Sequence, residues 1–135
     1  MSTDTAPANG TPAEARGELA VRTLAMPADT NPSGDVFGGW LMSLMDVAGG
    51  IAAGGLAQGR VATVAVTDMA FLRPVKAGDV VRCYTDLARR GRTSLTLRVE
   101  AWVLRQRLGD RIQVTSADFT YVALDGDGRP RPIPQ

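Results

Sequence analysis

Residues 29–55 read DTNPSGDVFGGWLMSLMDVAGGIAAGG, a Pro/Gly-rich loop that runs into a long helical pattern. At about 100° per residue, one set of apolar side chains falls within a stripe of about 120°. This set is Leu41, Leu44, Met45, Ala48, Ile51 and Ala52. The opposite side is also poor in charge and consists of Gly39, Met42, Ser43, Asp46, Gly50 and Ala53. The pattern therefore predicts a buried core helix of about 14 to 18 residues, too short and too rich in glycine to span a bilayer.

Four glycines lie inside this predicted helix, at positions 49, 50, 54 and 55. Each costs about 1 kcal/mol of helix stability relative to alanine. We therefore expect other backbone to approach the helix closely at these positions.

Asp46 is the one ionisable side chain of the helical pattern. Burial of a carboxylate is unfavourable unless it is paired, hydrogen-bonded or in contact with a water-filled site. One interpretation is a structural acid that is satisfied by a turn or an arginine. The other is a general base or nucleophile whose properties are set by an apolar pocket.

The composition excludes several classes of function. With 135 residues, a net charge of +1 and 21% charged residues, the chain predicts one domain without bulk attraction to nucleic acid or to a membrane. The sequence has no histidine, which excludes Ser-His-Asp and Cys-His catalysis and most zinc sites. Its single cysteine, Cys83, excludes an intrachain disulfide. We expect no metal and no cofactor, and carboxylates remain as the natural bases.

The N-terminus lacks the pattern of a signal peptide, so a soluble cytoplasmic protein is expected. Residues 1–17 have the composition of a disordered tail, and residues 18–135 form the single predicted domain. Strands are predicted at residues 18–26, 61–72, 79–88, 93–104 and 112–124. In the segment 93–104 apolar and polar residues alternate, which predicts one buried face. The order of elements predicts an α+β fold in which an antiparallel sheet of about five strands wraps one buried helix.

The sequence closely resembles the YciA-type acyl-CoA thioesterases of the hotdog-fold superfamily over about residues 19–134. The motifs that carry the resemblance are RTLAMP at 22–27, DTN at 29–31, GD at 34–35, FGGW at 37–40, MD at 45–46, GRV at 59–61, FLRPV at 71–75, GDVV at 78–81 and EAWV at 100–103. Each motif alone is weak, whereas the set is highly specific. The resemblance implies a helix enclosed by a curved antiparallel sheet, active sites at a homodimer interface and further assembly into a hexamer. It also implies that Asp46 is the catalytic acid and that Asn31 is the asparagine of the catalytic loop.

The residues themselves fit thioester hydrolysis, which needs a group that activates water or attacks the carbonyl, and donors for the developing oxyanion. Asp46 supplies the first. The backbone N–H groups of Gly38 and Gly39, at a helix N-terminus, supply the second. The amide of Asn31 is suited to hold water or the carbonyl. The alternatives are a tight turn for the glycines and an Asx-turn before Pro32 for the asparagine.

Seven residues separate Gly39 from Asp46, which corresponds to about 10 Å along one helix. One carbonyl therefore cannot contact both residues of the same chain. We predict that two helices pack antiparallel in a dimer, so that Asp46 of one chain lies near Gly39 and Asn31 of the other.

The phosphates of coenzyme A require a local basic patch. One candidate is the segment Arg89–Ser94, in which Arg90, Gly91, Arg92 and Ser94 are the predicted binding residues, and the other is Arg60. A solvated hairpin turn is the alternative for any single arginine.

Two other functions are weighed against the thioesterase. A hotdog-type hydratase is disfavoured because such enzymes usually carry an active-site histidine. A non-catalytic acyl-CoA-binding subunit is disfavoured by the joint presence of Asn31, Gly39 and Asp46.

Overall fold

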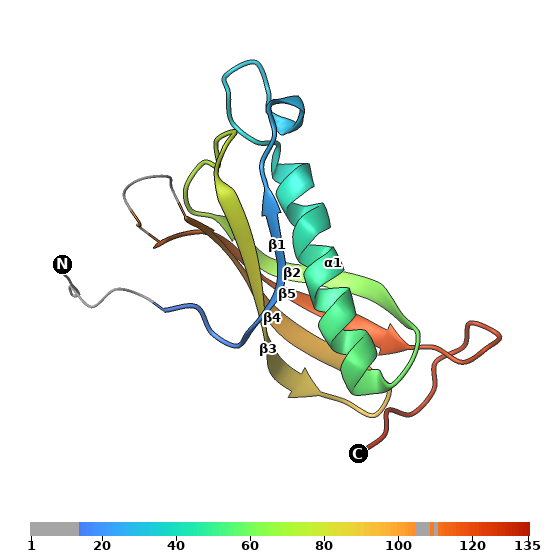
Figure 1. Ribbon diagram of the computed structural model, residues 1–135. Coiled ribbons are helices and arrows are strands. Elements are labelled where there is room, and N and C mark those ends of the chain that lie inside the picture. Colours follow the sequence, from blue (N-terminus) through green and yellow to red (C-terminus); the bar gives the residue numbers. More distant parts are fainter. Residues whose placement is uncertain (1–13, 105–108, 110) are drawn as a thin grey trace.

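The computed structural model describes residues 14–104, 109 and 111–135, and it confirms the predicted α+β plan. One helix and five strands follow each other in the order in which the sequence predicts them (Figure 1). They are β1 (Glu18–Leu24), α1 (Gly38–Ala57), β2 (Val61–Phe71), β3 (Val80–Arg90), β4 (Ser94–Leu104) and β5 (Arg111–Ala123), with a short 3-10 helix at Pro27–Asp29 before α1.

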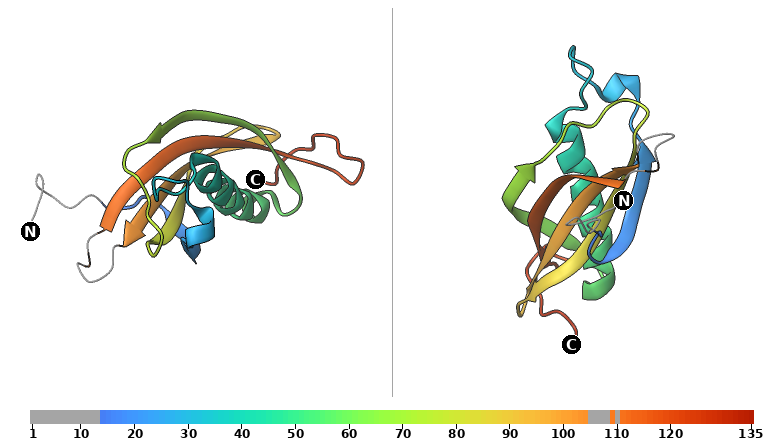
Figure 2. Two further views of the ribbon diagram at one scale, coloured as in Figure 1. Left: turned by 90° about the horizontal axis from the view of Figure 1, so that it is seen from above. Right: turned by 90° about the vertical axis from the view of Figure 1, so that its left-hand side faces the viewer.

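The five strands form one antiparallel sheet in the order β1-β3-β4-β5-β2. The sheet curves around α1, which lies along its concave side (Figure 2). β1 and β2 are the two edge strands, so each presents one row of backbone groups to another chain. This is the hotdog architecture that the resemblance implies.

Helix α1 has defined ends and is longer than predicted. It has 20 residues, because the chain turns into the left-handed region only at Gln58, where φ is 55°. Beyond that turn Arg131 Nη2 donates a 2.8 Å hydrogen bond to the carbonyl of Ala57, at the helix C-terminus. An 18-residue window of the helix has a mean hydropathy of 1.4, so by length and composition the helix could cross a membrane, and the prediction from length is wrong. Its role as a core helix rests instead on its packing against the sheet.

The buried face of α1 differs in part from the predicted stripe. Ile51 was predicted to be buried but is 57% exposed, whereas Ala53, on the predicted opposite side, is fully buried. Periodicity failed here because the helix is apolar nearly all round, so no polar face marks the solvent side. The buried residues are Leu41, Met45, Ala48, Gly49, Ala53 and Ala57. Four large apolar side chains of α1 are more than a third exposed, namely Met42, Val47, Ile51 and Leu56.

The glycines of α1 serve different purposes. A Cβ on Gly49 would lie 2.2 Å from the hydroxyl oxygen of Tyr121, so the close neighbour there is a side chain and not the predicted backbone. A Cβ on Gly54 would lie 3.5 Å from the carbonyl oxygen of Gly59, as expected for backbone contact. Gly55 would meet nothing within 4 Å, which contradicts the predicted close approach.

β4 is buried on both faces, contrary to the predicted single buried face. Its core-facing residues Leu95, Leu97, Val99, Ala101 and Val103 are at most 1% exposed. On the outer face Glu100 and Trp102 are also buried. The Trp102 indole N–H donates a hydrogen bond to Glu100 Oε1, and the backbone N–H of Arg16 donates to the same oxygen. Most of the predicted tail, residues 1–13, lies outside the described residues.

Candidate active site

Asp46 is held by two hydroxyl groups on neighbouring strands. Thr63 Oγ1, on β2, donates to Asp46 Oδ1 at 2.7 Å. The hydroxyl of Tyr121, on β5, lies 3.0 Å from the same Oδ1 and 3.0 Å from the backbone carbonyl oxygen of Asp46. Oδ2 accepts no hydrogen bond within the part of the chain that the structure describes. The partly buried carboxylate therefore has one anchored and one available oxygen, and no described arginine pairs with it.

Tyr121 stays protonated and is therefore a permanent donor. Its side chain is 1% exposed, and burial followed by the hydrogen bond to Asp46 raises the pKa of its hydroxyl above the usual range. Sequence reasoning missed both Thr63 and Tyr121 because each is far from Asp46 along the chain. One signal was available for Tyr121, which alternates with Phe119 and Ala123 on a core-facing strand side, so that its hydroxyl needed a buried partner.

The start of α1 presents two backbone donors. The N–H groups of Trp40 and Leu41 donate to the carbonyl of Phe37, whereas those of Gly38 and Gly39 have no acceptor among the described residues. Phe37 gives no side-chain cap, so the positive end of the helix dipole is uncompensated there. Such a pair of free N–H groups is suited to a carbonyl oxygen that gains negative charge.

Neither Gly38 nor Gly39 has a positive φ, so the tight-turn interpretation does not account for these glycines. A Cβ at position 38 would lie 3.3 Å from the Phe71 ring, while a Cβ at position 39 would meet nothing within 4 Å. The space in front of Gly39 is therefore open to a molecule from outside this chain.

Asn31 forms the Asx-turn that was the alternative to its functional role. Its Oδ1 accepts hydrogen bonds from the backbone N–H groups of Ser33 at 2.9 Å and Asp35 at 3.1 Å. The loop is joined to the following segment, because Val36 N–H donates to the carbonyl of Val75 and Lys76 forms an ion pair with Asp35. These contacts fix the orientation of the amide, and the Nδ2 donor has no partner within the described residues. The turn role and a donor role thus use different atoms of the same side chain.

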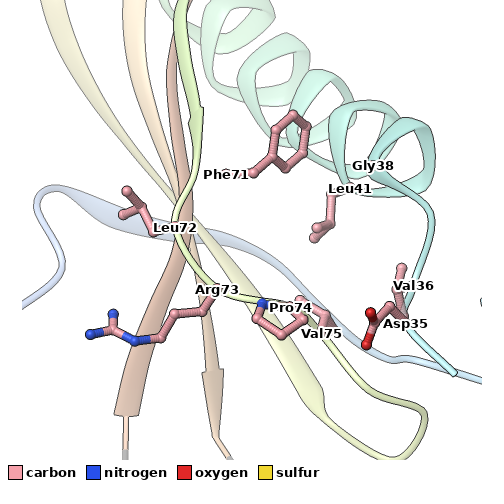
Figure 3. Close-up of a pocket in the computed structure, with 9 residues that line it drawn as sticks. All are labelled: Asp35, Val36, Gly38, Leu41, Phe71, Leu72, Arg73, Pro74 and Val75. Atoms are coloured by element: carbon pink, nitrogen blue, oxygen red, sulfur yellow. The ribbon is translucent and has the colours of Figure 1, made fainter. Parts of the chain in front are cut away.

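A pocket of about 330 Å³ lies beside Gly38, between the start of α1 and the end of β2 (Figure 3). Phe71 points from the strand toward the helix, and Leu41 lines the helix side. The other residues that line it are Asp35, Val36, Leu72, Arg73, Pro74 and Val75. Most of these side chains are apolar, so the pocket is suited to an apolar group held next to the free N–H groups.

The predicted basic residues gather at the opposite end of α1. Arg89 and Arg90 end β3, Gly91 and Arg92 form the turn, and Ser94 begins β4. The C-terminal segment joins this hairpin to Arg60, since Ile133 N–H donates to the carbonyl of Arg92 and Leu124 N–H donates to that of Arg60. Arg90 Nη1 also donates to the carbonyl of Pro134 at 3.0 Å.

These arginines are exposed, and none of Arg60, Arg89, Arg90 or Arg92 pairs with a carboxylate of the described residues. The hairpin and Arg60, predicted as alternative sites, thus form one basic region. Gly91 is packed within the turn, where a Cβ would lie 2.7 Å from Ser94 Oγ. A side chain at position 91 would therefore require the Ser94 hydroxyl to rotate away.

Comparison with known proteins gives a consistent picture. The model of the family described as "Thioesterase superfamily" matches residues 33–110. The acyl-CoA thioester hydrolase YciA of Salmonella typhimurium is 56% identical over 122 residues, which cover 88% of this chain and 92% of that protein.

Solved structures show the same likeness. A hexameric thioesterase from Yersinia pestis has 54% identity and a TM-score of 0.86, covering 90% of this chain and 99% of its own. An aspartate-to-alanine variant of a hexameric broad-specificity acyl-coenzyme A thioesterase has 50% identity and a TM-score of 0.87, covering 89% of this chain and 88% of its own.

Proposed function

We propose that this chain, which belongs to the thioesterase superfamily, hydrolyses acyl-CoA thioesters to a free acid and coenzyme A. The observation that carries the proposal is the state of Asp46, a carboxylate whose Oδ1 is anchored by two hydroxyl groups while Oδ2 has no described donor. The relatives that match nearly the whole chain support the same activity, with broad specificity for the acyl group.

Hydrolysis breaks the bond between the carbonyl carbon and sulfur and adds water across it. With Asp46 as general base, Oδ2 takes a proton from the attacking water, and the CoA thiolate leaves and is then protonated. With Asp46 as nucleophile, Oδ2 attacks the carbonyl and expels the CoA thiolate to form a mixed anhydride, and water then opens the anhydride to the free acid and the Asp46 carboxylate. In single-turnover hydrolysis in heavy-oxygen water, label in the Asp46 carboxylate identifies an anhydride that water opens at the Asp46 carbonyl, because the general-base route places the label in the released acid alone.

The oxyanion is stabilised at the start of α1. The N–H groups of Gly38 and Gly39 have no acceptor among the described residues, and the helix dipole adds to their partial positive charge. Asn31 Nδ2 supplies a third donor, which orients the attacking water or the thioester carbonyl. The pocket beside Gly38 then receives the first part of the acyl chain.

The complete site is formed by two chains. Gly39 and Asp46 are separated by about 10 Å along one helix, and the structure gives no contact between Asp46 and Asn31 within one chain. The exposed apolar side chains Val47 and Ile51 of α1 and the edge strand β2, where Val64 is 57% exposed, provide a surface for a second copy. A homodimer that pairs these surfaces brings Asp46 of one protomer to the glycines of its partner. The hexameric assembly of the relatives supports further association of such dimers.

Coenzyme A extends from this site toward the basic region formed by Arg60, Arg90 and Arg92. Asp46 lies eleven residues before the last residue of α1, a separation of about 16 Å along the helix. The long pantetheine arm of coenzyme A separates its thioester from its phosphates, so it matches this arrangement. We infer that the protein acts in the cytoplasm. Its one cysteine, Cys83, is a free thiol, which is consistent with a reducing compartment.

The test is release of free thiol from a panel of acyl-CoA substrates of increasing chain length. The wild-type protein is expected to turn over several of them, and Asp46→Ala is expected to lose about 100-fold or more of that activity while the fold is kept. Asp68→Asn is the matched control, since Asp68 is exposed, lies on β2 and has a φ of 53° that asparagine tolerates. Binding of acyl-CoA without thiol release would instead identify a non-catalytic acyl-CoA-binding subunit.

A further inference from the structure

The hydroxyl of Tyr121 makes a contact that the reaction itself does not require. It lies 3.0 Å from both Oδ1 and the backbone carbonyl oxygen of Asp46. The side chain therefore bridges the carboxylate and the helix backbone at the same residue. A tyrosine needs only one hydrogen-bond partner to satisfy a buried hydroxyl, so this double proximity fixes where the Asp46 side chain lies relative to α1.

The helix is built to admit this hydroxyl. A Cβ on Gly49 would lie 2.2 Å from the hydroxyl oxygen, 2.9 Å from Cζ and 3.0 Å from Cε1 of Tyr121. The ring could not keep its place beside any larger residue. Tyr121 itself is 1% exposed and is supported by the Phe119 ring, whose centroid is 6.4 Å away in a stacked arrangement. The donor is thus rigidly placed, and an interior glycine that destabilises a helix has a reason to be there.

The second donor to Oδ1 behaves differently. Thr63 lies on the edge strand β2 and is exposed, so water competes for its hydroxyl. Tyr121 lies on β5, inside the sheet, and its hydroxyl remains protonated because burial raises its pKa. Both hydroxyl groups keep their protons, and of the two donors Tyr121 is the one that is shielded from solvent.

From this geometry we propose that Tyr121 is a positioning residue for Asp46: together with Gly49, which makes room for it, Tyr121 anchors Oδ1 so that Oδ2 is held ready for the reaction. This proposal rests on the proposed function of Asp46. Tyr121 does not touch the substrate, and its effect passes through the carboxylate alone.

The test is the variant Tyr121→Phe, which keeps the ring and removes only the hydroxyl. We expect kcat to fall about tenfold while KM changes less than about twofold, since the donor acts on a catalytic group and not on substrate binding. Tyr84→Phe is the control, because Tyr84 is the other of the two tyrosines and makes no hydroxyl hydrogen bond with a described residue. Its kcat is expected to equal that of the wild type.

A double-mutant cycle separates positioning from general loss of structure. In the Asp46→Ala background, Tyr121→Phe is expected to leave the residual turnover unchanged. An equal tenfold loss in both backgrounds, or a wild-type kcat in Tyr121→Phe, would overturn the proposal. If the wild type itself releases no thiol, the proposed function fails, which is a different outcome.

A spectroscopic measurement covers the case in which Tyr121→Phe does not fold. Incorporation of 3-fluorotyrosine into the Tyr84→Phe protein gives a single fluorine resonance, from residue 121. Its chemical shift is expected to change when Asp46→Ala removes the acceptor and to remain constant in the control Asp68→Asn. An unchanged resonance in Asp46→Ala would contradict the coupling between the two side chains.

Discussion

Thr63 and Asp46 are joined by a 2.7 Å hydrogen bond that connects the edge strand β2 to the middle of α1. The variant Thr63→Val keeps the shape of the side chain and removes the donor. Because Thr63 is exposed and Tyr121 still holds Oδ1, kcat for acyl-CoA hydrolysis is expected to fall about threefold, less than in Tyr121→Phe, with little change in KM. Steady-state thiol release measures both constants.

Thr67→Val is the matched control for this prediction. Thr67 is exposed on the same strand, and its side chain makes no hydrogen bond with a described residue. Equal losses of kcat in the two variants would show that the hydroxyl of Thr63 has no specific role.

The basic region predicts a selective effect on substrates that carry the CoA phosphates. The double variant Arg90→Glu/Arg92→Glu is expected to raise KM for acyl-CoA about tenfold or more, because two attractive charges become repulsive. For a truncated thioester without phosphates, KM should stay near the wild-type value. Arg22→Glu, a charge reversal on β1, serves as the control. A rise in KM that is the same for both substrates would argue against phosphate binding at this hairpin.

Gly49 and Gly50 are adjacent on α1 but are expected to differ in how much stability they lose on substitution by alanine. A Cβ on Gly49 would clash with Tyr121 at 2.2 Å, whereas a Cβ on Gly50 would lie at an ordinary 3.9 Å from the same ring. Gly49→Ala should therefore lower the free energy of unfolding by about 1–3 kcal/mol, and Gly50→Ala should change it by less than about 1 kcal/mol. Urea denaturation compares the two, and similar values would refute the account of Gly49.

Cys83 is expected to be inert in the folded protein. Burial raises the pKa of its thiol to about 12, so the reactive thiolate is nearly absent at all pH values below that range. An aromatic disulfide reagent at pH 8 should leave the native protein unlabelled and modify one thiol per chain after denaturation. Rapid labelling of the native protein would show that this part of the core opens.

The sequence predicted the four strands after α1 well because β-branched residues are frequent in them and they lie between turn residues such as those at Gly78 and Gly91. It predicted the position of α1 but not its orientation, since the helix has apolar residues on all sides and the sheet alone decides that Ala53 is buried and Ile51 exposed. Local patterns carry no information of that kind.

In the candidate site, too, some features could be predicted from the local sequence and others depend on the fold. Asp46 was visible as a charged residue in an apolar helix, and the outline of the Asn31 turn was visible in the loop. The hydroxyl groups that hold Asp46 come from residues 17 and 75 positions away, so only the fold brings them together. The grouping of Arg60 with the hairpin arginines likewise depends on the return of the C-terminal segment, which no local motif announces.

Complementation between two inactive variants tests the two-chain active site most directly. Asp46→Ala and Asn31→Ala are each expected to be nearly inactive alone. When the two chains are combined in equal amounts and allowed to form mixed dimers, one site per mixed dimer has Asp46 from one chain and Asn31 from its partner intact. Recovery of about one quarter of the wild-type activity is therefore predicted for random pairing. Mixed dimers that form but recover no activity would contradict the account, because Asp46 and Asn31 would then have to act within one chain.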